Sequence, residues 1–175
     1  LIKHLAKKLS CPYLLFDDYA DETTYPKDMK RWFEQGASLA DIKTPHFAAQ
    51  LANYRKYDEH QVVLIEEPFG RCRESISSLI DYVVLLDMPM EVCLSRVIKR
   101  SIEHTKSDSL KSITNYLAMY DDHFRDIYIA LTNEVRKSAD LIVRDVNSVE
   151  EIAQQVKHWL SNQKSIAYEE SKISS

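Results

Sequence analysis

Short, nearly unbroken runs of apolar residues recur along the chain, at 13–16, 62–65, 82–86 and 140–143. A strand that is apolar throughout has both of its faces covered, and such strands are typical of parallel sheets. We therefore expect four short, buried β-strands at these places.

Between these runs, apolar residues follow the three-to-four-residue spacing of helices with one buried face. Thr44 before Pro45 is a good helix start, because Thr caps the helix and Pro suits its first turn. Ser148 and Glu151 form a capping box. Helices are expected at 1–9, 28–34, 44–57, 74–80, 89–103, 109–137 with one break, and from 148 to about 161. Strands that alternate with helices predict an α/β fold, with a parallel sheet built from right-handed crossovers.

The chain has 175 residues, of which 45% are apolar and 29% are charged, so it is expected to be globular. No internal repeat and no linker divides it. We expect a single domain over residues 1–161 and a polar tail over 162–175 that frays.

The composition also excludes some classes of partner. A net charge of −4 argues against a surface that coats nucleic acid, which needs clustered Lys and Arg. No apolar run approaches the roughly 18 residues of a membrane span. The three cysteines, Cys11, Cys72 and Cys93, have neither zinc-ligand nor redox spacing, and reduced thiols suit a cytoplasmic protein. A homodimer is left open as an alternative to a monomer.

Acids follow the apolar runs at three places, as Asp17, Glu66 and Asp87. In open α/β sheets ligands bind beyond the carboxyl ends of the strands. A carboxylate there can accept a proton from a substrate hydroxyl or hold a metal-bound water. Each acid taken alone is also consistent with a solvated loop that only caps backbone N–H groups.

Two arginines, Arg96 and Arg100, are four residues apart and share one face of a predicted helix. Guanidinium groups match the geometry of phosphate oxygens, but a solvated basic face is the plainer alternative. Arg71 and Arg73 follow the second strand and could meet an anionic substrate. Tyr116, Tyr120, Phe124 and Tyr128 recur every four residues, a stripe that favours core packing over a base-stacking platform.

Taken in order, four motifs resemble the P-loop kinases, and within them the uridine kinase and nicotinamide riboside kinase group. Phe16-Asp17-Asp18-Tyr19 is similar to the family motif at the end of the second strand. Residues 62–66 resemble the next strand, which ends in Glu, although Glu67 stands where the family has Gly. Residues 81–89 with the two arginines that follow resemble the strand that leads into the lid. Residues 139–145 resemble the last strand and the loop near adenine.

The resemblance implies a three-layer P-loop NTPase fold and an ATP-dependent kinase that uses Mg²⁺ to phosphorylate a hydroxyl of a small molecule, such as a nucleoside or riboside. It implies a helical lid near residues 90–110. The roles it implies are general base for Asp17, substrate binding for Asp18, Tyr19 and Arg71, phosphate contacts for Arg96 and Arg100, cofactor binding for Asn147, and a water-mediated Mg²⁺ contact for Glu66, with Glu67 as its rival.

One family element is not found in residues 1–175. The phosphate-binding loop G-x-x-x-x-G-K-[ST] needs clustered glycines, and Gly36 and Gly70 are isolated. Residues 1–9 nevertheless resemble the helix that follows this loop, so we expect the loop and the first strand to precede Leu1. The alternative is a true loss, which would leave a catalytically inactive, kinase-like nucleotide-binding or regulatory domain.

Overall fold

The fold alternates short strands with helices, and the computed structural model describes residues 1–57, 62–104 and 109–173. The strands are β1 (Tyr13–Leu15), β2 (Leu64–Glu66), β3 (Val84–Leu86) and β4 (Leu141–Val143). The helices are α1 (Ile2–Leu9), α2 (Met29–Glu34), α3 (Pro45–Tyr57), α4 (Glu74–Ser77), α5 (Met90–His104), α6 (Ser109–Met119), α7 (Arg125–Ser138) and α8 (Val149–Ile173). Four single turns complete the order: the 3₁₀ turns η1 (Phe16–Asp18), η2 (Leu39–Asp41) and η3 (Gly70–Cys72), and the π-helical turn η4 (Tyr120–Phe124).

Two of the expected helix starts, those of α2 and α8, are confirmed by capping hydrogen bonds. The side chain of Asp28 accepts from the Arg31 N–H at 2.9 Å at the start of α2. Ser148 and Glu151 form the reciprocal capping box of α8, with Ser148 N–H donating to the carboxylate at 2.8 Å and Glu151 N–H donating to the hydroxyl at 3.2 Å. The chain therefore enters these helices where the sequence pattern predicts.

All four strands form at the expected places, but they pair differently from a continuous sheet. β1 pairs with β2 and β3 pairs with β4, both in parallel, with Leu14 opposite Ile65 and Leu85 opposite Ile142. Parallel pairing is confirmed. Within the described residues the strands make two separate two-stranded sheets, so one edge of β2 and one edge of β3 carry no strand.

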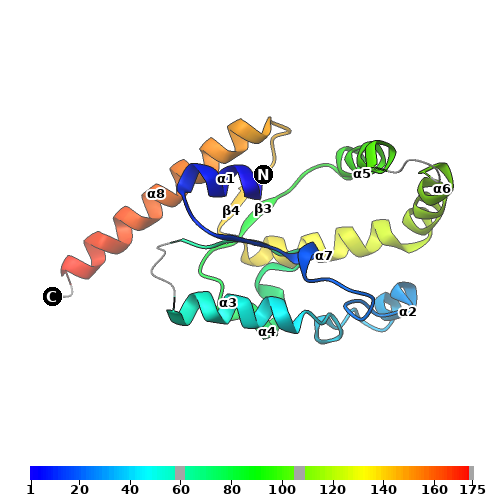
Figure 1. The fold of residues 1–175 in the computed structure, drawn as a ribbon, viewed down its shortest axis with the longest axis horizontal. Helices are drawn as coiled ribbons and strands as arrows, with labels where there is room; N and C mark the ends of the chain where they lie inside the picture. Colours follow the sequence, from blue (N-terminus) through cyan, green and yellow to red (C-terminus); the bar gives the residue numbers. More distant parts are fainter. Residues whose placement is uncertain (58–61, 105–108, 174–175) are drawn as a thin grey trace.

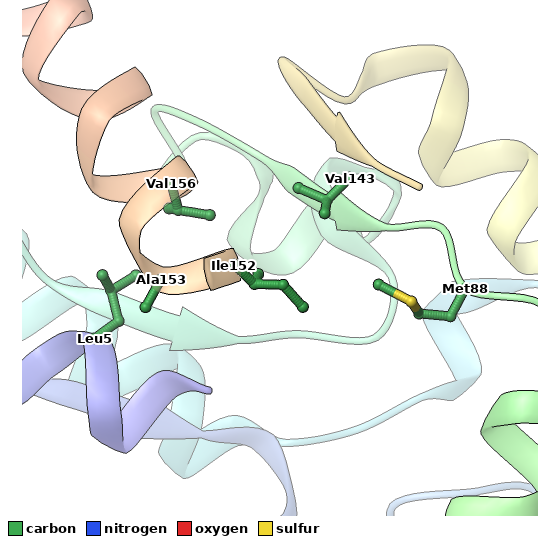
Figure 2. Close-up of a cluster of buried hydrophobic side chains, with 6 residues drawn as sticks. All are labelled: Leu5, Met88, Val143, Ile152, Ala153 and Val156. Carbon is green, nitrogen blue, oxygen red and sulfur yellow. The ribbon is translucent and has the colours of Figure 1, made fainter. Parts of the chain in front are cut away.

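Helices cover the strands from two sides. Figure 1 shows α1 and α8 on one side of the strands and α3 and α4 on the other. On the first side, Leu5 of α1 meets Ile152, Ala153 and Val156 of α8 over Val143 of β4, as Figure 2 shows. Half-buried Leu64 and Val84, from β2 and β3, pack against this same cluster. The two sheets thus share one core.

On the opposite side, Leu14 of β1 packs against Phe47 and Leu51 of α3 and Ile76 of α4. A third buried cluster joins the end of β1 to α2 and α7, and consists of Phe16, Trp32, Ile42, Phe69 and Ile127. The residue that precedes Asp17 is therefore fixed in a core, while Asp17 itself is exposed.

Gly70 shows why η3 needs glycine. Its φ of +52° lies in the left-handed region, and an added Cβ would lie 3.3 Å from Cγ1 of Val135. This glycine closes a tight buried turn after β2, where it could not form part of a phosphate-binding loop.

One boundary differs from the sequence-based expectations, one expected break is found, and one expected segment extends beyond the described residues. α8 runs on to Ile173 instead of ending near 161, because residues 162–173 contain helix formers and neither Gly nor Pro. The break expected in the 109–137 stretch is the π-helical turn η4. Of the expected lid at 90–110, residues 105–108 lie outside the described residues.

Candidate functional site

Asp17 and Glu66 come together at the carboxyl ends of β1 and β2. Leu15 lies opposite Glu66 in the parallel register, and η1 carries Asp17 and Asp18 directly beyond Leu15. Asp17, Asp18 and Glu66 are exposed. Three carboxylates are thus presented to solvent at one end of this sheet, as expected for a site built on parallel strands.

The charges around Glu66 show which other elements reach this site. Partial desolvation of its carboxyl raises the pKa of Glu66 above its usual value although the residue as a whole is exposed, and the charges of Asp17 and Asp18 add to the shift. The guanidinium of Arg100 acts in the opposite direction. The middle of α5 therefore approaches these acids, and α1 lies beside β1 and β2.

The two arginines of the predicted lid differ in the groups on which their charges act. Arg100 acts on Glu66, whereas Arg96 acts on Cys93, whose pKa is raised by burial and lowered again by the Arg96 charge. Both arginines are exposed. Asn147 lies in the exposed loop between β4 and α8, where its N–H donates to the Asp145 carbonyl at 2.9 Å. Of these three residues, Arg100 is the one with an interaction that links it to the acids.

Arg71 is held by the scaffold. Its guanidinium donates to the Ser138 carbonyl at 2.7 Å, to the Asp140 carboxylate at 2.8 Å, and to the carbonyls of Ile80 and Asp81. These partners lie just before β3 and β4. The structure thus places Arg71 at the amino ends of the second sheet, and the substrate-binding role stays a prediction.

Glu66 and Glu67 have opposite surroundings. The Glu67 side chain is only 3% exposed and accepts from the Arg73 guanidinium at 2.8 Å. Burial raises the pKa of Glu67 to about 7, although the Arg73 charge favours its ionised form. Glu66 is consequently the acid that this strand end presents to solvent.

Tyr25 lies near Asp17, and its charge also acts on Tyr128 of the aromatic stripe, a link that the sequence did not reveal. The Tyr25 ring packs 6.1 Å from the Phe16 ring, and burial together with the charges of Asp17 and Glu67 raises the Tyr25 pKa to about 12. The hydroxyl oxygens of Tyr116 and Tyr128 lie 3.5 Å apart. We call Tyr25, Tyr116 and Tyr128 the tyrosine wall.

The expected core packing of the aromatic stripe holds for most of its length, because Tyr120 is buried and Phe124 packs against the core cluster of α2 and α7. Tyr120 is buried at 7% exposure, but Tyr128 is 37% exposed. Burial and the hydrogen bond to Tyr116 raise the Tyr128 pKa, and Tyr25 contributes as well. The π-helical turn η4, which begins at Tyr120, changes the helical phase along this stripe, and such turns are frequent at functional sites. Tyr19, in contrast, is half-buried, with its ring centre 5.5 Å from that of Phe47 in an edge-to-face arrangement.

The exposed acids at the ends of β1 and β2 can hold a metal ion only together with other ligands. Across the described residues, no three His, Cys, Asp or Glu side chains are grouped so that they could bind a metal. Mg²⁺ characteristically keeps several waters and is bound through one or two carboxylates plus substrate phosphates. The exposed acids fit Mg²⁺ in that manner and do not fit a metal that requires a complete protein cage.

A scan against models of known protein families matched none of them, and a search of curated proteins found no relative. Over the described part of the chain, no helix is both long and apolar enough to cross a membrane. The function must therefore be argued from the geometry of the site.

Proposed function

We propose that the chain is the larger part of a cytoplasmic, ATP-dependent kinase that phosphorylates a hydroxyl of a small molecule with the help of Mg²⁺. The observation that supports this proposal best is the convergence of Asp17 and Glu66 at adjacent strand ends, with Arg100 acting on Glu66 and α1 packed beside both strands. Phosphoryl transfer needs few covalent contributions from the protein, because positioning and charge stabilisation supply most of the catalysis.

Asp17 is the proposed general base. Its carboxylate accepts the proton of the acceptor hydroxyl as that oxygen bonds to the γ-phosphorus of ATP, and the bond from the γ-phosphorus to the leaving oxygen of ADP breaks. Asp17 suits this role because it is exposed, while Phe16 before it is fully buried and holds the backbone in place.

Glu66 is the proposed Mg²⁺-side acid, which would hold a metal-bound water. The ion, when bound, neutralises charge on the phosphates. Arg100 would approach the same phosphates from α5, and its attraction to Glu66 is consistent with that approach. Arg96 and Asn147 are proposed contacts to the nucleotide.

The acceptor is proposed to bind between Asp17 and the tyrosine wall. Asp18 and Tyr19 continue from Asp17 on η1 and would contact the acceptor as well. The tyrosine rings offer flat apolar surface together with hydroxyl groups, which supports a nucleoside or riboside as the acceptor.

The phosphate-binding loop is proposed to lie directly before Leu1. Support comes from the unpaired edges of β2 and β3, which both pack on the core formed by α1 and α8. One further parallel strand between them would join the two sheets and lead into α1. Without such a loop, the chain would instead be an inactive, kinase-like binding or regulatory domain.

Kinetics of single substitutions test the proposal in the full-length chain across Mg²⁺ concentrations. Asp17→Asn is expected to lower turnover by about 10²–10⁴-fold with nearly unchanged ATP binding. Glu66→Gln is expected to shift the Mg²⁺ optimum or weaken Mg²⁺-dependent nucleotide binding. Asp81→Asn is the matched control, because Asp81 is an exposed acid that pairs with Arg55 away from this site.

The outcomes separate the assignments. Full turnover in Asp17→Asn would refute the general base, and a Mg²⁺ shift in Glu67→Gln alone would exchange the roles of the two glutamates. A wild-type chain that consumes no ATP with nucleosides, ribosides or small alcohols would favour the inactive domain.

A further inference from the structure

Arg73 is the most deeply buried charged residue described, with 2% of the residue exposed. Its guanidinium carbon lies 5.3 Å from the Phe16 ring centre and 5.7 Å from that of Phe47. One terminal nitrogen donates to the Glu67 carboxylate at 2.8 Å, and the other donates to the Thr44 hydroxyl. A single side chain thus joins the end of β1, the segment after β2 and the start of α3.

Two of these partners are chain neighbours of the proposed catalytic acids. Phe16 directly precedes Asp17, and Glu67 directly follows Glu66. The planar guanidinium stacks on the first and forms an ion pair with the second. A shift of either strand end would have to break a buried contact of Arg73, since a packed core does not deform continuously.

We propose that Arg73 is a positioning residue that fixes Asp17 and Glu66 relative to one another by holding Phe16 and Glu67. The catalytic consequence rests on the proposed kinase function; the structural consequence does not. Lysine could not substitute, because a single ammonium group lacks the planar fork that both stacks on rings and reaches two oxygen partners.

The energetics of the pair favour positioning over simple stabilisation. A buried ion pair has to offset the desolvation of both charges, and well-packed apolar side chains in its place are often as stable or more stable. Among the described atoms, Nε of Arg73 is buried without a hydrogen-bond partner. An unsatisfied buried donor is unfavourable. A buried ion pair with an unsatisfied donor is not what stability alone would favour at this position.

The test is a paired substitution, Arg73→Met with Glu67→Leu, in the full-length chain. It removes both charges together, so neither is left buried and unpaired, and it retains apolar volume. Arg73→Lys is the single-substitution companion. Val156→Ala is the control for lost stability, because Val156 is 6% exposed in the separate cluster of α1 and α8.

We expect the paired variant to unfold at a denaturant concentration close to that of the wild type. Its kcat should nevertheless fall by about 10²-fold, the effect of misplacing catalytic groups by about 1 Å, with the KM for ATP little changed. The Tyr19 amide, which donates to the Phe16 carbonyl at 3.0 Å, should exchange with deuterium faster, while the Ile152 amide in α8 should not. Val156→Ala should show neither effect.

A paired variant with both the kcat and the stability of the wild type would overturn the positioning role of Arg73. A purely structural role predicts that result. Wild-type exchange at Tyr19 in that variant would overturn the positioning role too, and this measurement needs no activity. If the wild-type chain proves inactive, the proposed function fails, and exchange at Tyr19 alone decides whether Arg73 holds the strand ends.

Discussion

Charged side chains in this protein divide into those that hold the fold and those presented at strand ends. Arg136 donates to both carboxylate oxygens of Asp87, at 2.6 and 3.1 Å, and so ties α7 to the end of β3. Arg71 and Arg73 are likewise engaged by the scaffold. Asp17, Asp18 and Glu66 remain exposed, and Arg100 is the cation drawn toward them.

This division predicts different effects for the two arginines of α5. Arg100→Ala is expected to lower turnover more than Arg96→Ala, because the Arg100 charge acts on Glu66 and the Arg96 charge acts on Cys93. The loss for Arg100 should be on the order of 10²–10³-fold, as for removal of a group that stabilises developing charge. Steady-state kinetics with a denaturation curve for each variant provide the measurement.

Both α5 variants should retain the wild-type stability to within about 0.5 kcal/mol, because exposed charges contribute little to folding. Equal losses of turnover in the two variants would contradict the distinction between them. An unfolded Arg100→Ala chain would mean that the residue supports the fold instead of the phosphates.

At the scale of elements, the most informative feature is that each sheet of the described chain is only two strands wide, which leaves one edge of β2 and one edge of β3 without a strand. Each sheet has only two strands of three residues, a size that is marginal without further partners. Leu64, Ile65, Val84 and Leu85 are half-buried, whereas strands that are apolar throughout are normally covered. A strand between β2 and β3 would bury them.

This geometry predicts what residues before Leu1 would do. Adding the preceding segment should slow amide exchange in Leu64–Glu66 and Val84–Leu86 and raise the denaturation midpoint, because backbone groups of both edges would gain partners. The outer strands, Tyr13–Leu15 and Leu141–Val143, serve as internal controls. Hydrogen exchange followed by mass spectrometry provides the measurement.

Unchanged exchange at both inner strands would contradict the inserted strand. A preceding segment of about ten residues without Gly-Lys-Ser or Gly-Lys-Thr would argue for the inactive domain, because no helix start would then cradle the phosphates.

At the scale of the whole molecule, the first and last helices close the fold on one side. α1 packs against α8 around Leu5 and Ile152, and Glu150 joins the same helices at the surface by accepting from Lys8 and pairing with His4 at 2.8 Å. Hydrogen bonds from Lys8, Gln154 and His4 lower the Glu150 pKa to about 2.

The lowered pKa predicts a pH-dependent contribution to stability. A carboxyl whose pKa is depressed in the folded state stabilises it above the unfolded pKa, and the gain is lost as pH falls through the folded value. Glu150→Gln should therefore be less stable than the wild type at pH 7, and the difference should shrink as pH falls from about 4.5 and vanish below pH 2. Urea unfolding across this range measures it.

Glu134→Gln is the matched control, because Glu134 pairs with Lys137 within one helix and joins no separate elements. Added salt should reduce the Glu150 effect, since the group is exposed. A wild-type advantage at pH 2 as large as that at pH 7 would contradict the assignment.

The sequence by itself determined the local features of this protein. The apolar runs predicted the four strands, and the Ser148–Glu151 capping box predicted the start of α8. These features depend on residues close together in the chain, whose spacing matches the repeat of a strand or the turn of a helix. The acids that directly follow the apolar runs could be identified for the same reason, because they are neighbours of those runs in the chain.

Only the tertiary structure decided which side chains are available for chemistry. Glu66 and Glu67 are adjacent residues of the same type in the sequence. In the structure Glu66 is exposed at the strand end, whereas Glu67 is buried against Arg73. Arg71 bonds to the carbonyl of Ser138, 67 residues away, and no local pattern encodes that partner. Burial and long-range pairing arise only when elements pack together. They determine the ionisation and solvent exposure of side chains and the order of the strands, which the periodicity of the sequence does not encode.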